Sequence, residues 1–282
     1  MICYNMLYIM GFLGCGKMER DLRGALADIR GFLLDLDGTF YLGNKLLEGS
    51  LAFLEKLRIT GRSALFLTNN SSKSGEAYVQ KLRGMGVEEP FLRVLTSGQV
   101  TGRYAMAHHP GKKAFVLGNE ELRNELSSMG VPQEQNGADY LIAGYDTSLD
   151  YAKMAKACDL VRSGLPYIAT HPDVNCPTEE GFAPDIGAII AFIKASTGRK
   201  PDVILGKPYR GIVMDALERI ALTPGELAMV GDRLYTDIAT GVNYGILSIL
   251  VLTGETKARD LQKSKIRPDF VVERLSQLIE FL

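Results

Sequence analysis

Short apolar runs alternate with helical patterns along most of this chain, and this alternation constrains the fold more than any other feature. The runs Gly31–Leu34 and Ala64–Leu67 read as buried strands, and Ser50–Arg58 between them repeats leucine at helical spacing. Strands that alternate with helices favour a parallel sheet covered by helices. The sequence therefore predicts a doubly wound α/β fold, in which ligands bind beyond the carboxyl ends of the strands.

An insert divides this pattern. From about residue 108 the alternation of strand and helix begins again, and it continues to a helical pattern at Ile186–Thr197. A loop rich in Pro, Asp and Glu, His171–Pro184, precedes that helix, and the run Val203–Leu205 is expected to rejoin the first sheet. We therefore expect a core of residues 18–107 and 202–282, an inserted α/β domain at 108–201, and an uncertain N-terminal extension at 1–17.

Composition and charge narrow the class of protein. Hydrophobic residues make up 46% of the 282 residues, which is enough for a core, and the formal net charge of −1 gives no basic field for nucleic acid. The four cysteines form no CxxC pair, so reduced thiols in a cytoplasm are favoured. The apolar segment Met1–Gly16 is short for a membrane span and lacks the positive start of a secretory signal. We expect a cytoplasmic protein without nucleic-acid or membrane partners.

Four polar fragments follow predicted strands in one order along the chain. They are Asp35-Leu36-Asp37-Gly38-Thr39, Thr68-Asn69-Asn70, Gly206-Lys207-Pro208 and Gly231–Asp237. Each fragment alone has an ordinary explanation as a turn, a solvated lysine or a helix cap. Because the carboxyl ends of parallel strands meet at one edge of a sheet, their joint occurrence favours a single site.

The residue types in these fragments suit phosphoryl transfer. A carboxylate nucleophile divides the slow hydrolysis of a phosphate monoester into two steps, and we expect Asp35 in that role. Asp37 is placed to protonate the leaving oxygen and later to deprotonate water. Gly38 lets backbone amides turn toward the phosphoryl oxygens, Thr68 offers a hydroxyl, and Lys207 supplies a positive charge. These roles predict an aspartyl-phosphate intermediate.

Acidic residues in the first and last fragments predict a divalent cation. Asp35 and Asp232 offer oxygen ligands, and oxygen and water ligands favour Mg²⁺. Asp237 stands about one helical turn beyond Asp232, so it is expected to hold a metal-bound water or to orient Lys207.

Residues of the loop before the last helix of the insert are expected to contact the substrate. His171 and Asp173 are the candidates, and Asp185 lies beside them. A lone histidine in a Pro-rich loop is, however, more often a surface or structural group than a functional one. Gly38 and Asn69 are the substrate-binding candidates outside the insert.

The four motifs resemble those of the haloacid dehalogenase superfamily of phosphatases, most closely the NagD-like branch, to which 4-nitrophenyl phosphatases are related. They read DLDGTFYLGN (35–44), FLTNNSS (66–72), GKP (206–208) and MVGDRLYTDI (229–238), and the resemblance covers residues 31–282. It implies a Rossmann-like core with a large α/β cap of the C2 type at 108–201, which closes over the site and carries the specificity.

The resemblance also implies a role for each matching residue. Asp35 corresponds to the nucleophile and Asp37 to the general acid and base. Thr68 and Lys207 correspond to the residues that bind the phosphoryl group. Magnesium is then expected to be bound by Asp35, Asp232 and the carbonyl group of Asp37.

Hydrolysis of small phosphate monoesters, with a sugar phosphate, nucleotide or aryl phosphate as substrate, is the expected activity. A phosphotransferase or mutase would use the same phospho-enzyme, and a non-catalytic sensor would bind the same ligand. The α/β pattern of the insert argues against mutases, whose caps are smaller and helical, and the presence of both Asp35 and Asp37 argues against a sensor. The expected partner is a small phosphorylated metabolite, and dimerisation through the cap stays open.

Overall fold

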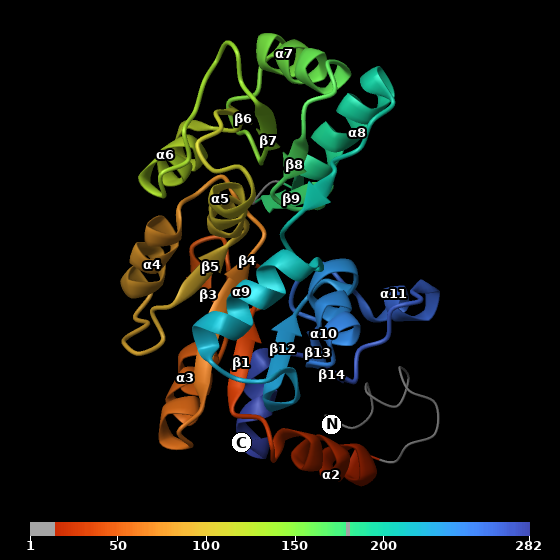
Figure 1. Ribbon diagram of the computed structural model, residues 1–282. Coiled ribbons are helices and arrows are strands. Elements are labelled where there is room, and N and C mark those ends of the chain that lie inside the picture. Colours follow the sequence, from red (N-terminus) through yellow and green to blue (C-terminus); the bar gives the residue numbers. More distant parts are fainter. Residues whose placement is uncertain (1–14, 179–180) are drawn as a thin grey trace. The chain divides into compact units, whose positions relative to one another are not determined.

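The computed structural model describes residues 15–178 and 181–282, which form two compact units (Figure 1). The first unit comprises the described residues up to Phe66 together with Met85–Phe91 and Leu217–Leu282, and the second comprises Leu67–Gly84 and Leu92–Ala216. The extension predicted at 1–17 lies outside the described residues, apart from the start of helix α2 at Cys15. The predicted boundaries of core and insert stay predictions.

A parallel sheet forms the centre of the first unit. Its strand order is β14-β13-β12-β1-β4, and β5 follows β4 in that order. The strands of the first unit are β1 (Gly31–Leu34), β4 (Ser63–Thr68), β12 (Leu227–Gly231), β13 (Leu247–Val251) and β14 (Phe270–Val272). The residues of β5 (Val94–Thr96) belong to the second unit. β1 lies between β12 and β4, with Leu34 opposite both Val230 and Phe66. This arrangement confirms the predicted α/β class.

Helices and short turns complete the first unit. They are α2 (Cys15–Leu26), α3 (Ser50–Ile59), α10 (Ala239–Tyr244), α11 (Ala258–Lys263), η1 (Pro224–Glu226), η2 (Leu234–Ile238) and η3 (Leu275–Phe281), with a small hairpin of β2 (Tyr41–Leu42) and β3 (Lys45–Leu46). α3 buries Phe53, Leu54 and Leu57, and the Phe53 ring meets that of Phe32 on β1 edge-on, with centroids 5.3 Å apart. Burying each such side chain contributes about 1.5–3 kcal/mol, so helical spacing of apolar residues fixes α3 on the sheet.

A second parallel sheet, of order β11-β8-β7-β6, forms the centre of the second unit. Its strands are β6 (Ala114–Leu117), β7 (Tyr140–Ala143), β8 (Tyr167–Ala169) and β11 (Val203–Ile204), and the helices of this unit are α4 (Gly75–Gly84), α5 (Ser97–His108), α6 (Glu120–Ser128), α7 (Tyr151–Arg162) and α8 (Ile186–Thr197). Cys158 on α7 and Ile189 and Ile193 on α8 share one apolar core with the strands. Helix α9 (Arg210–Ile220) continues from the second unit into the first.

Two local predictions are wrong. The run Val203–Leu205 does not rejoin the first sheet, because β11 pairs with β8 in the second, with Val203 opposite Ile168. An apolar run records burial but not which of two buried parallel sheets it joins. The segment predicted as a loop, His171–Pro184, contains an antiparallel hairpin of β9 (Asn175–Thr178) and β10 (Gly181–Pro184). Proline and glycine hide its strand pattern, and a two-stranded hairpin tolerates proline because both strands are edges.

Among the described residues, no helix is both long enough and apolar enough to cross a bilayer.

Candidate functional site

Three acidic side chains gather at the carboxyl ends of two neighbouring strands in the first unit. Asp35 follows β1 and Asp232 follows β12, and the parallel pairing of these strands brings both residues to one edge of the sheet. One carboxylate oxygen each of Asp35, Asp232 and Asp237 lies within 4.8 Å of the others. Asp37 is half-buried on the loop that follows Asp35. The structure thus brings together three of the four predicted metal-binding residues through their carboxylates.

Asp237 reaches this cluster through η2, which is a π-helical turn. The backbone N–H groups of Asp237 and Ile238 both donate to the carbonyl oxygen of Arg233 at 3.1 Å, and the Arg233 N–H donates to Asp237 Oδ2 at 3.0 Å. Gly231 makes room, because a Cβ atom there would lie 2.2 Å from Asp237 Cβ. The pattern of glycine at the strand end and aspartate six residues later is therefore a packing requirement.

Asp232 is almost fully buried between two loops. The N–H of Glu255 donates to Asp232 Oδ2 at 2.6 Å, and Cβ atoms at Gly38 and Gly254 would lie 2.8 and 2.0 Å from the same oxygen. The other oxygen, Oδ1, has no hydrogen-bond partner among residues 15–178 and 181–282. A buried carboxylate oxygen without a partner is costly, and a bound cation would remove that cost.

The charge balance of the cluster also favours a cation. Burial and, to a smaller extent, the negative charge of Asp237 together raise the pKa of Asp232 to about 7. Arg233 acts in the opposite direction, but its Nε atom also pairs with Glu255 Oε2 at 3.0 Å. Carboxylate oxygens suit hard divalent cations. Asp35, Asp232 and Asp237 therefore form a candidate metal site.

The loop after β13 supports this site and is not among the predicted site residues. Besides the bond from Glu255, the Thr253 hydroxyl donates to the Gly38 carbonyl oxygen at 2.6 Å. One signal for this loop is present in the sequence, because Thr253-Gly254-Glu255 directly follows an apolar run in a parallel sheet, where ligand-binding loops occur.

The remaining predicted residues lie in the second unit. Lys207 is almost fully buried, and its Nζ donates to the Leu67 carbonyl oxygen at 3.1 Å. Its backbone N–H donates to Asn69 Oδ1 at 2.7 Å. Thr68 ends β4, and its hydroxyl oxygen accepts the N–H of Asn70 at 3.2 Å. The structure thus joins Lys207 directly to the segment that carries Thr68 and Asn69.

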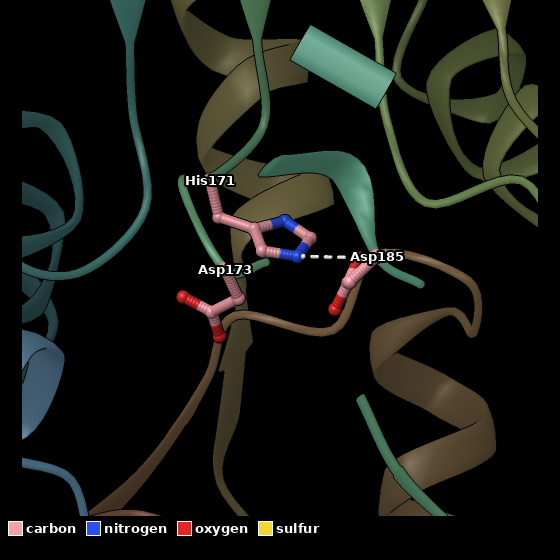
Figure 2. A group of neighbouring side chains, drawn as sticks. All are labelled: His171, Asp173 and Asp185. Atoms are coloured by element: carbon pink, nitrogen blue, oxygen red, sulfur yellow. Dashed lines mark hydrogen bonds and ion pairs between the residues drawn. The ribbon is translucent and has the colours of Figure 1, made fainter. Parts of the chain in front are cut away.

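A second cluster, His171 with Asp173 and Asp185, lies in the same unit (Figure 2). His171 is fully buried, with Nε2 3.1 Å from Asp185 Oδ1 and Nδ1 2.9 Å from the hydroxyl of Thr170. Asp185 caps α8 by accepting the Ile186 N–H. Since a carboxylate only accepts, Nε2 carries the proton of the His171–Asp185 bond. Contact of His171 with a substrate stays a prediction.

The chain is similar to known proteins over most of its length. Residues 32–132 match a family described as haloacid dehalogenase-like hydrolase, and residues 204–278 match one described as HAD-hydrolase-like. An acid sugar phosphatase of Staphylococcus aureus (strain MRSA252) is 38% identical over 251 residues, which is 89% of this chain and 96% of that protein.

Solved structures agree with these matches. The crystal structure of 4-nitrophenylphosphatase from Thermotoga maritima has a TM-score of 0.87 and 46% identity, covering 91% of this chain and 98% of that one. NagD from E. coli K-12 has a TM-score of 0.79 and 32% identity, covering 88% of this chain and 98% of that one.

Proposed function

This chain belongs to the haloacid dehalogenase-like hydrolases, and on that premise we propose that it is a phosphatase that hydrolyses phosphate monoesters of small molecules. Membership of this family confirms the resemblance that its motifs carry. The observation that carries the proposal is the cluster of Asp35, Asp232 and Asp237, in which a buried oxygen of Asp232 lacks a hydrogen-bond partner among the described residues. Such a cluster suits a cation that binds a phosphoryl group.

We infer that the cation is Mg²⁺. The carboxylates of Asp35 and Asp232 and, by the family resemblance, the carbonyl oxygen of Asp37 would hold it. When bound, it supplies positive charge that offsets the carboxylates and the phosphoryl oxygens. The supporting observations are the oxygen-only side chains of the cluster and the buried Oδ1 of Asp232.

Two steps make up the proposed reaction. In the first, an Asp35 oxygen attacks phosphorus, the bond to the leaving oxygen breaks, and Asp37 gives that oxygen a proton. In the second, water attacks the aspartyl phosphate, Asp37 takes a proton from the water, and inorganic phosphate leaves with the Asp35 carboxylate restored. The Thr68 hydroxyl and the Lys207 ammonium would bind phosphoryl oxygens, because their charge and hydrogen bonds offset the charge on the transferred group.

Sugar phosphates and aryl phosphates are the substrates that we propose first. The Staphylococcus aureus relative is named as an acid sugar phosphatase and the Thermotoga maritima relative as a 4-nitrophenylphosphatase. Nucleotides are the third class. A small phosphorylated metabolite as partner, a cytoplasmic location, and a homodimer through a cap at 108–201 stay predictions.

Release of inorganic phosphate from a panel of these esters tests the proposal. We expect release with Mg²⁺, none with a chelator, and a loss of about 10⁴-fold or more in Asp35→Asn, because the nucleophile is removed. Asp159→Asn makes the same chemical change at an exposed position of α7 and is expected to retain full activity. A folded, metal-loaded protein that releases phosphate from no ester would contradict the proposal. Transfer to an added alcohol in place of water would favour the phosphotransferase alternative.

A further inference from the structure

The side-chain amide of Asn69 joins two segments that are far apart in the sequence. Its Nδ2 donates to the Lys207 carbonyl oxygen at 2.9 Å and to Asp173 Oδ1 at 3.0 Å, while its Oδ1 accepts the Lys207 N–H at 2.7 Å. Asn69 therefore satisfies both backbone polar groups of Lys207, as a neighbouring strand would. All three side chains are buried, so these bonds form in an environment with little competing water.

The backbone around Lys207 is held from a second direction. Gly206 N–H donates to the Thr170 carbonyl oxygen at 2.7 Å. A Cβ atom at Gly206 would lie 2.6 Å from both Asn69 Oδ1 and His171 Cβ, so glycine is needed for this approach. The Lys207 ammonium is thus aimed by a backbone that is fixed on one side by Thr170 and on the other by Asn69.

Asp173 is in turn anchored to the start of α8. Its carbonyl oxygen accepts the Gly187 N–H at 2.7 Å, and Asp185 N–H donates to the Val174 carbonyl oxygen at 2.9 Å. The His171–Asp185 pair ties the same segment to the helix from the other side. Figure 2 shows this pair, with the Asp173 carboxylate directed away from the imidazole ring. That carboxylate instead receives the Asn69 amide.

The same cluster has the ligand types of a metal site, and its hydrogen bonds argue against that use. Asp185 Oδ1 already accepts from His171 Nε2 and, at 2.6 Å, from the Ile186 N–H. Asp173 Oδ1 already accepts from Asn69. A metal would have to displace these bonds, whereas the bonds themselves account for the burial of each charge.

We propose that Asp173 is a positioning residue that acts through Asn69 to aim Lys207. This inference rests on the proposed function, in which Lys207 binds the phosphoryl group. It assigns Asn69 and Asp173, two of the four predicted substrate-binding residues, to the support of the Lys207 ammonium. The start of α8 and the segment before it thereby help to set the position of the Lys207 ammonium, which acts in the proposed reaction.

Turnover of 4-nitrophenyl phosphate by Asp173 variants is the first test. Asp173→Ala removes one of the two acceptors of Asn69 Nδ2 and leaves the Lys207 carbonyl oxygen as the other. We expect kcat to fall about 10- to 100-fold with KM changed less than about threefold, because a misplaced Lys207 ammonium chiefly weakens stabilisation of the transition state. Asp173→Asn retains a carbonyl oxygen that accepts the same bond, so we expect kcat within about twofold of wild type.

Glu125→Gln provides the matched control. Glu125 is another buried carboxylate of the second unit, and it accepts the Gly75 N–H at 2.7 Å. We expect this variant to lower the melting temperature while kcat stays at the wild-type value. It separates a change in Lys207 from a general loss of packing.

Amide hydrogen exchange at Lys207, measured by NMR, is a readout that needs no turnover. We expect exchange of its backbone N–H to be about tenfold faster or more in Asp173→Ala, and near the wild-type rate in Asp173→Asn, because protection follows local stability. If Asp173→Ala does not fold, Asp173→Ser, whose side chain is too short to reach Asn69, takes its place.

Three results would overturn the positioning role. Equal loss of kcat in Asp173→Asn and Asp173→Ala would show that the carboxylate charge itself acts. A raised KM with unchanged kcat would show substrate contact. A stoichiometric metal that is present in the wild type and lost in Asp173→Ala would show a metal ligand. A different outcome would separate the two proposals. If the wild type releases no phosphate from any ester while exchange at Lys207 is still faster in Asp173→Ala, the proposed function is rejected and the positioning role is retained.

Discussion

The two clusters of ionisable side chains differ in how their charges are satisfied. In the first unit, Asp232 is buried beside Asp237, and its Oδ1 has no hydrogen-bond partner in the described chain. In the second unit, His171 meets Asp185 at 3.1 Å and Asp173 receives the amide of Asn69 at 3.0 Å. Proximity alone does not separate the clusters, because the ligand atoms of both lie within 4.8 Å of one another.

This difference teaches how to tell a binding site from a structural connection. A buried carboxylate oxygen that lacks a donor carries an electrostatic cost, which a ligand can relieve. A buried carboxylate with its own donors contributes stability and fixes position, and an added ligand must first break those bonds. The experiments below test this distinction by changing one cluster at a time.

Replacing Asp232 should have the largest effect. We expect Asp232→Asn to lower Mg²⁺-dependent kcat by about 10²- to 10³-fold, because a charged ligand at the site of the transferred group is lost. Titration of kcat with Mg²⁺ measures this. Asp146→Asn, the same change at a buried aspartate outside both clusters, is expected to keep the wild-type value. Equal losses of kcat in the two variants would contradict a metal-binding role for the first cluster.

Metal and pH should act together on the first cluster. The folded-state pKa of Asp232 is raised to about 7, above that of the unfolded chain. The folded state therefore loses stability as pH rises through about 4 to 7, because the buried carboxyl group ionises at a cost that the unfolded chain does not bear. Bound Mg²⁺ offsets that cost and competes with the proton. At pH 8, a saturating cation should therefore stabilise the folded state by about 2.7 kcal/mol, which raises the melting temperature by about 5–10 °C.

At pH 5.5 the same addition should raise the melting temperature much less. Differential scanning fluorimetry at the two pH values, with and without chelator, makes the comparison. A shift of the same size at both values would exclude the Asp232 carboxylate as the group that couples metal and proton.

Replacing His171 should have the smallest effect, and the change in the free energy of unfolding should not depend on metal. His171→Ala leaves the buried Asp185 carboxylate without one donor, which costs about 1–3 kcal/mol in the free energy of unfolding. Chemical denaturation with Mg²⁺ and with chelator should give the same loss. His108→Ala, at an exposed histidine of the second unit, should stay within about 0.5 kcal/mol of wild type. A loss that disappears in chelator would place a metal in the second cluster.

The strands, the helices and the polar residues that follow the strands could be predicted from the sequence where the signal is local. Asp35 and Asp232 each follow an apolar run, and the rule that parallel strands share a carboxyl edge predicts their meeting. Each predicted helix of the insert has apolar residues at helical spacing, and α8 begins and ends at the predicted residues, Ile186 and Thr197. These features depend on neighbours along the chain.

Features that depend on distant partners could not be predicted in the same way. The pairing of β11 with β8 depends on which exposed edge is available, and two-residue strands carry no sign of it. The bonds from Asn69 to Lys207 join residues 138 positions apart, and an asparagine at a strand end is equally compatible with substrate contact. The partnerless oxygen of Asp232 is a property of packing, which composition does not record.

The π-helical turn at Leu234–Ile238 has a consequence for which changes in sequence this site tolerates. Residues of the turn other than Asp237 can change as long as they fill the same space, but the number of residues cannot. Each residue added or removed between Asp232 and Asp237 would rotate the later carboxylate by roughly a quarter of a turn about the helix axis and carry it away from Asp35. Insertions and deletions here are therefore expected to break up the cluster, whereas substitutions that keep Asp237 and the packing are not.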